Sequence, residues 1–298
     1  MVPFRVRLLI SVCLLSVLCT FVFPQDVADQ LARIDQLQRS YPDVKFVCRY
    51  EPALSDIEIV LTSKNEEKRF VLFWSGGRML PAEELVNMDD FCPIVYEYPV
   101  RVEDPLGFTA DRIAEIREMT SKEARRKGAI TPTFFFDIVY DSSSRAAVTN
   151  HIKTTTFLGK KLNVHEKIIP PLKKVENNIL LLAKTDAETK NFVNRLSAAQ
   201  GFNWREIRDR NAKSFHSMGV AIDVLPSGWK QKNVYWAWRR DVVGDSWLFT
   251  PLDRRWMPPD AVIDAFEQEG FVWGGKWEVW DNMHFEYRPE IIAASKEQ

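Results

Sequence analysis

Residues 214–224 read SFHSMGVAIDV, and residues 280–286 read WDNMHFE. Together these stretches supply His216, Asp223 and His284, which are side chains of the types that hold a catalytic zinc ion. Such an ion takes three protein ligands and leaves a fourth position for water. The two stretches therefore predict a zinc site.

The spacing of His216 and Asp223 predicts a bend in the chain between them. On one helix, positions i and i+7 lie roughly 10 Å apart along the axis, too far for both to reach one ion. On one continuous strand they face opposite sides, because side chains alternate. Gly219 is the residue that permits the bend. We expect His216 on a loop and Asp223 on a short buried strand over residues 220–224.

Asp281 stands three positions before His284, close enough in the chain to approach the same metal without ligating it. Zinc lowers the pKa of a bound water towards about 7, so a nearby carboxylate is a sufficient proton acceptor at neutral pH. Asp281 is the predicted general base, and later the general acid.

Three motifs resemble the D-alanyl-D-alanine carboxypeptidase (VanY-like) family of zinc metallopeptidases, which includes L-alanyl-D-glutamate endopeptidases. They are the Ser-x-His-Ser-x-Gly-x-Ala-x-Asp segment, the run GFVWGGKW at residues 270–277, and the ending Asp-x-Met-His-Phe-Glu-Tyr-Arg-Pro. The resemblance covers about residues 160–290, whereas residues 25–160 carry no motif of this kind.

The resemblance implies roles for individual residues. It places zinc on His216, Asp223 and His284, the catalytic carboxylate on Asp281, and a substrate-binding arginine on Arg205. A planar guanidinium pairs well with the carboxylate of a peptide substrate. We expect the mechanism to use Arg205 for oxyanion stabilisation as well.

The implied substrate is the stem peptide of peptidoglycan. The carboxypeptidase and dipeptidase branches usually have glutamate as the catalytic acid, whereas this chain has the shorter Asp281, as the endopeptidase branch tends to. Removal of a terminal D-alanine and cleavage of an L-alanyl-D-glutamate bond or cross-link therefore both stay open. A third alternative is a wall-binding zinc protein that hydrolyses nothing.

Two further residues near the motifs have candidate roles. Ser214 either orients the loop or binds substrate. Glu286 is expected to hydrogen-bond a metal-bound imidazole or a nearby loop. The tryptophans of this half either wall a groove or pack in the core, which is their commoner role; they are residues 236, 238, 273, 277 and 280. His151 and His165 lie in polar stretches and are predicted at the surface.

Composition and charge narrow the classes of partner. The chain has 298 residues, with 40 basic and 41 acidic side chains, so it has no net field to attract nucleic acid or an anionic membrane. A metal other than zinc stays open, since affinity alone does not select one divalent ion in every compartment. The oligomeric state has no readable signal.

The N-terminus is predicted to be a secretory signal over residues 1–24. Arg5 and Arg7 precede an apolar run over residues 8–23 that is shorter than a membrane-spanning helix needs. The cleavage region has no clear small-x-small pattern, so membrane anchoring through this segment is an alternative, as is lipid modification of Cys19. The expected location is periplasmic or extracellular in a bacterium.

The mature chain then holds two cysteines, Cys48 and Cys92. In an oxidising compartment they form a candidate disulfide; two separate thiols are the alternative. Neither lies near the zinc motifs.

The expected fold class is α+β, with helices packed against a small antiparallel sheet that presents the zinc. Pro171, the Thr185–Glu188 capping pattern and Gly270 mark ends of helices in this half, with Gly201 as a further stop. Residues 271–273 and 284–287 are further expected strands. Residues 131–298 form the catalytic domain, and residues 25–130 an N-terminal extension of unknown role, with a helix over residues 27–39, strands over residues 57–62 and 70–74, and a helix capped by Thr109.

Overall fold

Four strands from the C-terminal half form the sheet that carries the candidate site. In the computed structural model, which describes residues 25–63 and 68–296, their order is β6-β7-β9-β8 and every neighbouring pair is antiparallel. The strands are β6 (Leu196–Gln200), β7 (Ala221–Pro226), β8 (Phe271–Trp273) and β9 (His284–Tyr287). Strand β7 is buried along its whole length, as its apolar sequence predicts.

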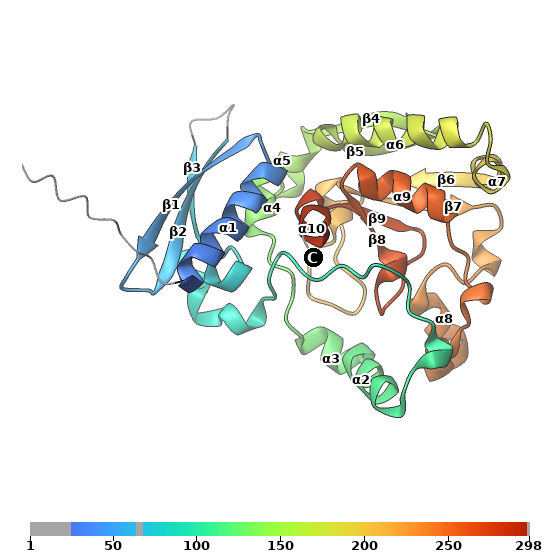
Figure 1. The fold of residues 1–298 in the computed structure, drawn as a ribbon, viewed down its shortest axis with the longest axis horizontal. Coiled ribbons are helices and arrows are strands. Elements are labelled where there is room, and N and C mark those ends of the chain that lie inside the picture. Colours follow the sequence, from blue (N-terminus) through green and yellow to red (C-terminus); the bar gives the residue numbers. More distant parts are fainter. Residues whose placement is uncertain (1–24, 64–67, 297–298) are drawn as a thin grey trace, which may run out of the picture.

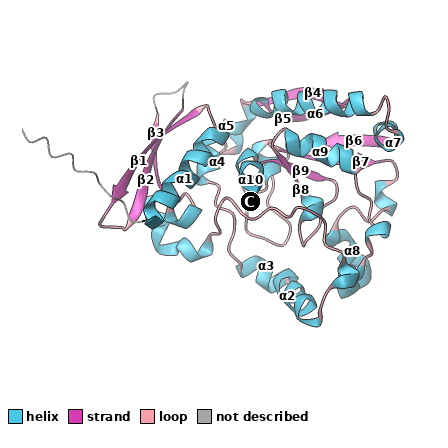
Figure 2. Ribbon diagram, viewed as in Figure 1, coloured by secondary structure: helices cyan, strands magenta, loops and turns pink. Residues whose placement is uncertain are grey.

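Helices and a hairpin pack around this sheet (Figure 2). Helix α6 contacts α7 and α9, and α9 contacts β8. The hairpin β4–β5 lies beside β6. The elements are β4 (Ile152–Phe157), β5 (Lys160–His165), α6 (Ile169–Leu182), α7 (Ala187–Arg195), α8 (Trp236–Val243), α9 (Asp260–Gln268) and α10 (Pro289–Ser295).

The N-terminal half contributes a second antiparallel sheet, in the order β1-β2-β3 (Figure 1). Helix α1 contacts β1 on one side and α10 on the other, so it joins the two halves. A single core of buried apolar side chains runs from Ile34 and Ile59 to Phe135 and Val220. The elements are α1 (Gln25–Ser40), β1 (Val44–Glu51), β2 (Asp56–Ser63) and β3 (Arg69–Phe73).

Residues 91–108 follow this sheet as an extended segment that crosses the C-terminal half before α2 (Figure 1). The Tyr98 hydroxyl donates to Glu267 (2.6 Å) and accepts from the Trp273 N–H (2.8 Å), which fixes the segment to α9 and β8. Four short helices follow: α2 (Ala110–Thr120), α3 (Lys122–Lys127), α4 (Phe134–Val139) and α5 (Arg145–Thr149). Helix α2 is capped by Thr109, as predicted.

The α+β class with small antiparallel sheets is confirmed, and so are most of the predicted elements. Three helix boundaries were wrong. Helix α6 begins at Ile169, two residues before Pro171. The other two boundaries are the start and the end of α7. The cap of α7 is Asp186, which accepts from the Thr189 N–H at 2.7 Å, whereas the Thr185 hydroxyl bonds back to α6. The helix ends at Arg195, well before Gly201, because the chain continues as the edge strand β6.

Several elements had no counterpart in the sequence analysis: β1, α3, α4, α5, β4, β5, β6, α8 and α10. The predicted signal segment over residues 1–24 lies outside the described residues. None of the helices in the described ranges is long and apolar enough to cross a membrane.

Candidate metal centre and cleft

Gly219 makes the predicted bend between His216 and Asp223. A tight turn, Phe215–Met218, is capped by the Ser214 hydroxyl, which accepts from the His216 N–H. Gly219 ends the turn with φ of 72°, in the left-handed region that favours glycine. A Cβ atom there would lie 2.8 Å from the backbone nitrogen of His165. The bend therefore needs glycine for its conformation and for the space.

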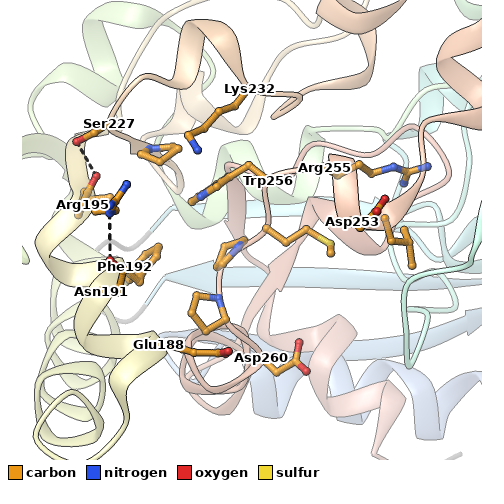
Figure 3. Close-up of a pocket in the computed structure, with 16 residues that line it drawn as sticks. Glu188, Asn191, Phe192, Arg195, Ser227, Lys232, Asp253, Arg255, Trp256 and Asp260 are labelled. Carbon is orange, nitrogen blue, oxygen red and sulfur yellow. Dashed lines mark hydrogen bonds between the residues drawn. The ribbon is translucent and has the colours of Figure 1, made fainter.

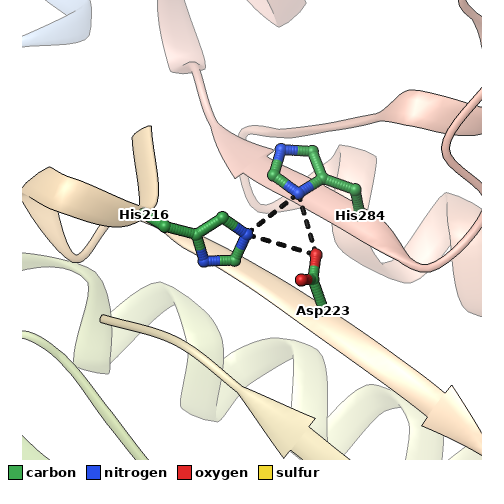
Figure 4. Close-up of side chains that lie close together, drawn as sticks. All are labelled: His216, Asp223 and His284. Atoms are coloured by element: carbon green, nitrogen blue, oxygen red, sulfur yellow. Dashed lines mark hydrogen bonds and ion pairs between the residues drawn. The ribbon is translucent and has the colours of Figure 1, made fainter. Parts of the chain in front are cut away.

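The bend and the strand register bring the predicted ligands together (Figure 4). Asp223 on β7 lies opposite His284 on β9, and His216 reaches them from the turn. His284 Nδ1 is 2.9 Å from Asp223 Oδ1, and His216 Nε2 is 3.2 Å from both. All three side chains are buried, and their donor atoms are close enough to hold one metal ion.

The outer nitrogens of both imidazoles already have partners. His216 Nδ1–H donates to the carbonyl of Gly201 at 2.7 Å, and His284 Nε2–H donates to Glu286 Oε1 at 3.0 Å. In these tautomers the neutral imidazoles have lone pairs on His216 Nε2 and His284 Nδ1. Both lone pairs and an oxygen of Asp223 then point at the centre of the cluster. Three acceptors without a donor between them repel one another, and a cation relieves this. The donor set of two nitrogens and one oxygen fits zinc.

Electrostatics point the same way. Burial alone would raise the pKa of Asp223, but His216 and His284 hold it well below its usual range. Burial would lower the pKa of His284, whereas its bonds to Asp223 and Glu286 raise it well above the usual range. The group of side chains thus favours positive charge at its centre.

Asp281 lies in the loop that leads into β9. Its backbone N–H donates to the carbonyl of Gly274 at 2.9 Å, and its carbonyl accepts from the His284 N–H at 3.2 Å. A Cβ atom on Gly274 would lie 2.8 Å from that Asp281 carbonyl, so glycine permits the close approach. Tyr235 pairs with Asp281 from the other side, in an isolated β-bridge.

Asp281 is half-buried, and one oxygen of its carboxyl group, Oδ1, is inaccessible to solvent. Its Oδ1 atom has no hydrogen-bond partner among the described residues. Burial raises its pKa to about 7, with His284 and Arg205 lowering it and Asp223 raising it. A carboxyl group with this pKa can both accept and donate a proton near neutral pH.

The predicted substrate-binding residues share one cavity with this acid. A cavity of about 260 Å³ is lined by Asp281, His284, Glu286, Arg205 and Ser214, among others. The Arg205 backbone N–H donates to the Ser217 hydroxyl at 2.8 Å, and its side chain is exposed. The structure therefore brings Arg205, Ser214, Glu286 and Asp281 to one cavity beside His284, and His284 joins this cavity to the cluster with His216 and Asp223.

The sequence analysis missed the residues that form the opposite wall. Tyr96, Arg125 and Thr131 from the N-terminal half line the same cavity, as does Tyr235. Tyr96 is held there because its hydroxyl accepts from Trp277 Nε1 at 2.9 Å. Burial, followed by the charge of Asp281, raises the pKa of Tyr235 to about 12. No motif in the sequence marks these side chains.

Two predictions about histidines and cysteines need correction. His165 is not at the surface: it is 1% exposed, because β5 turns it inwards against Tyr140. The candidate Cys48–Cys92 disulfide is not formed, and both cysteines are free. Cys48 is exposed on β1, and Cys92 lies with its sulfur 3.6 Å from the Thr131 hydroxyl.

The tryptophans divide between the two roles considered. Trp236, Trp273 and Trp280 are each 1% exposed and belong to the core. Trp277 and the buried Trp236 line the cavity, and Trp238 is 38% exposed.

A separate pocket of about 570 Å³ lies between α7 and residues 252–260 (Figure 3). Its wall includes Phe192 stacked on Trp256, with Arg195 bonded to Asn191. The described residues that line it include no histidine or cysteine. The pocket has no set of metal ligands like that of the cavity with Asp281.

Comparison with known proteins supports the interpretation of the C-terminal half as a peptidase. Residues 208–287 match the family model described as D-alanyl-D-alanine carboxypeptidase, a range that contains His216, Asp223, Asp281 and His284. Residues 33–96 match a domain of unknown function (DUF8518). No curated protein and no solved structure matches the chain. The match supports a hydrolase of the metallopeptidase class that acts on peptidoglycan.

Proposed function

We propose that this chain is a zinc-dependent peptidase that removes the terminal D-alanine from peptidoglycan stem peptides. One observation carries the proposal: a buried cluster of three metal-binding side chains reaches, through His284, a cavity that is also lined by a carboxyl group with a free, buried oxygen. The metal-binding side chains are His216, Asp223 and His284, and the carboxyl group is that of Asp281.

The residues then divide the work. Zinc held by His216, Asp223 and His284 would polarise the scissile carbonyl and lower the pKa of water. Asp281 accepts the proton of the attacking water at Oδ1 and returns it to the leaving amine. Arg205 binds the substrate carboxylate and supports the developing oxyanion.

Two residues support this arrangement. Glu286 accepts the Nε2–H of His284, which orients the ring and raises its basicity as a ligand. Ser214 caps the turn that holds His216 and also lines the cavity, where it can contact substrate.

An endopeptidase that cuts an L-alanyl-D-glutamate bond or a cross-link is the second candidate, and the shorter Asp281 favours it. A non-catalytic zinc protein that binds the wall is the third. The free Oδ1 of Asp281 argues against the third candidate, because a pure binder gains nothing from a buried, unpartnered carboxyl oxygen.

We further propose that residues 1–24 are an export signal, residues 25–130 an extension, and residues 131–298 the catalytic domain. The enzyme then acts in the periplasm or outside a bacterial cell.

Mass spectrometry of stem peptides tests the proposal. The zinc-loaded protein is incubated with a peptide ending in D-alanyl-D-alanine, with the same peptide as its C-terminal amide, and with purified peptidoglycan. We expect loss of one D-alanine from the free acid and none from the amide. Cleavage of the amide at an internal bond would establish the endopeptidase instead. Failure of the Asp281→Ala variant to lose activity would refute the assigned base.

A further inference from the structure

The cavity with Asp281 has an excess of guanidinium groups. Arg208 pairs with Asp241 at 2.5 Å beside it. By contrast, three further arginines of the lining, Arg125, Arg205 and Arg210, have no carboxylate within 4.0 Å among the described residues. Arg205 is already assigned to the substrate carboxylate, so two cations remain without an anionic partner.

Arg125 is the more unusual of these because it is buried. It is 9% exposed, and its Nε–H has no hydrogen-bond partner among residues 25–63 and 68–296. Its Nη2 donates to the carbonyl of Arg208 at 3.3 Å, and its guanidinium lies 5.0 Å from the centroid of the Trp236 ring. Burial lowers its pKa, and the charge of Arg210 lowers it further. A buried cation in such surroundings is costly unless an anion offsets it.

Arg125 also stands at the mouth of the cavity. A neighbouring pocket of about 780 Å³ shares five lining residues with the cavity of Asp281: Tyr96, Arg125, Arg210, Trp277 and Val279. The rest of this pocket is lined by five glutamates as well as by Arg112, Met119 and Lys276, so Arg125 and Arg210 stand where it turns from acidic to basic; the glutamates are Glu97, Glu103, Glu115, Glu118 and Glu278. A substrate that extends out of the cavity therefore passes Arg125 and Arg210.

We propose that Arg125, with Arg210, forms a second anion subsite that binds a second carboxylate of an acidic peptide substrate. The inference rests on the proposed peptidase function and names the chemistry of its substrate: a peptide with one carboxylate for Arg205 and another further along the chain. A planar guanidinium binds such a group through two parallel N–H donors. Arg125 lies outside both ranges matched by family models, whereas Arg210 lies within the range of the peptidase model, so the subsite combines the two halves of the chain.

The test uses two synthetic peptides that differ only in this second carboxylate, which is free in one and amidated in the other. Steady-state kinetics are measured for the zinc-loaded full chain and for two variants. Arg125→Met removes the buried guanidinium, and Arg126→Met, at the exposed neighbouring position, is the matched control. We expect the unmodified protein and the control to prefer the diacid by about 10- to 100-fold in kcat/KM. Arg125→Met is expected to lose this preference, mainly through KM.

Further measurements separate the outcomes. Zinc content and melting temperature show whether Arg125→Met is folded, and Arg125→Lys, which keeps the charge, is expected to retain part of the preference. Equal kcat/KM for both peptides in the unmodified protein would overturn the subsite while leaving the peptidase intact. If neither peptide is cleaved, the peptidase proposal fails. Calorimetric binding still decides the subsite in that case, because the diacid must bind more tightly than the amide only when Arg125 is present.

Discussion

The sheet β6-β7-β9-β8 and the segment of residues 96–131 face each other across one cavity, yet they are specified in different ways. The sheet carries its functional residues in short motifs, where Asp223 and His284 are fixed opposite each other by strand register. The segment contributes Tyr96, Arg125 and Thr131, which lie far apart in sequence and meet only through tertiary packing. Metal chemistry is thus encoded locally, whereas the shape of the substrate cleft depends on both halves of the chain.

Removal of a ligand should have the largest effect. In His216→Ala we expect the bound zinc to fall from one equivalent to a small fraction, with loss of hydrolysis, because two ligands hold the ion poorly. Elemental analysis after gel filtration measures the zinc. His151→Ala, at a partly exposed histidine bonded to Glu166, is the control and should keep its metal. Full zinc content in His216→Ala would remove this residue from the ligand set.

The difference between the two regions explains what the sequence could predict. Gly219 and the motif around it predicted the bend and the set of ligands, because a turn conformation and ligand chemistry are local properties of the sequence. By contrast, the side-chain pattern of β6 (LSAAQ) is short and only partly buried, so it could not be told from the end of a helix. Pairing with β7 makes this segment a strand, and that pairing joins residues that are distant in the sequence.

The cleft wall could not be predicted for the same reason. Arg125 sits in a basic run at residues 125–127 that predicts a solvated helix face. Only the packing of α3 against the loop of Arg208 and the ring of Trp236 shows that one of the three side chains is buried.

Acid should destabilise the region behind the metal site through His165. Its Nε2–H donates to the Tyr140 carbonyl at 3.1 Å and its Nδ1 accepts from the Lys167 N–H at 3.1 Å, so both nitrogens are used by the neutral ring. Burial lowers its pKa to about 4, and His151 and Lys167 add to this while Glu166 opposes it. The unfolded chain, with a pKa of about 6.5, then binds a proton that the folded chain does not.

The stability is therefore complete above about pH 6.5 and is lost as the pH falls towards 4. We expect a loss of about 3 kcal/mol from this group between pH 7 and pH 4. Urea unfolding across this range, compared with His165→Gln, isolates the contribution. Parallel pH profiles for the two proteins would contradict the assignment.

The hydrogen bond between Glu286 and His284 should tune the affinity of the site. In Glu286→Gln we expect zinc affinity to fall by about 10- to 100-fold, because the imidazole loses a charged acceptor. Competition with a chromophoric chelator measures the constant. Glu278→Gln, in the loop that precedes β9, should leave the affinity unchanged. An unchanged affinity in Glu286→Gln would limit this residue to its ion pair with Arg288.

A buried contact between the halves gives a stability test of their union. The Tyr41 hydroxyl donates to Glu290 at 2.6 Å, joining the end of α1 to α10. Loss of this bond in Tyr41→Phe should lower the free energy of unfolding by about 2 kcal/mol, since the acceptor is charged. Tyr50→Phe, in β1 of the same half, controls for the loss of a hydroxyl. Urea titration measures both, and equal values would show that the contact contributes nothing specific.

The smallest expected effects bear most directly on the comparison of the two regions. Thr109→Ala removes the cap of α2 at the cleft wall, and Ser144→Ala removes the cap of α5, which lies outside the segment of residues 96–131. Each should cost about 1 kcal/mol. Because Ile116 of α2 packs in a buried apolar cluster with Trp236 and Trp280 of the C-terminal half, both variants should shift the same single unfolding transition, whether followed by tryptophan fluorescence or by circular dichroism. Two transitions, each moved by only one variant, would show that the cleft is built between separate folding units, and that the wall with Arg125 can move independently of the metal site.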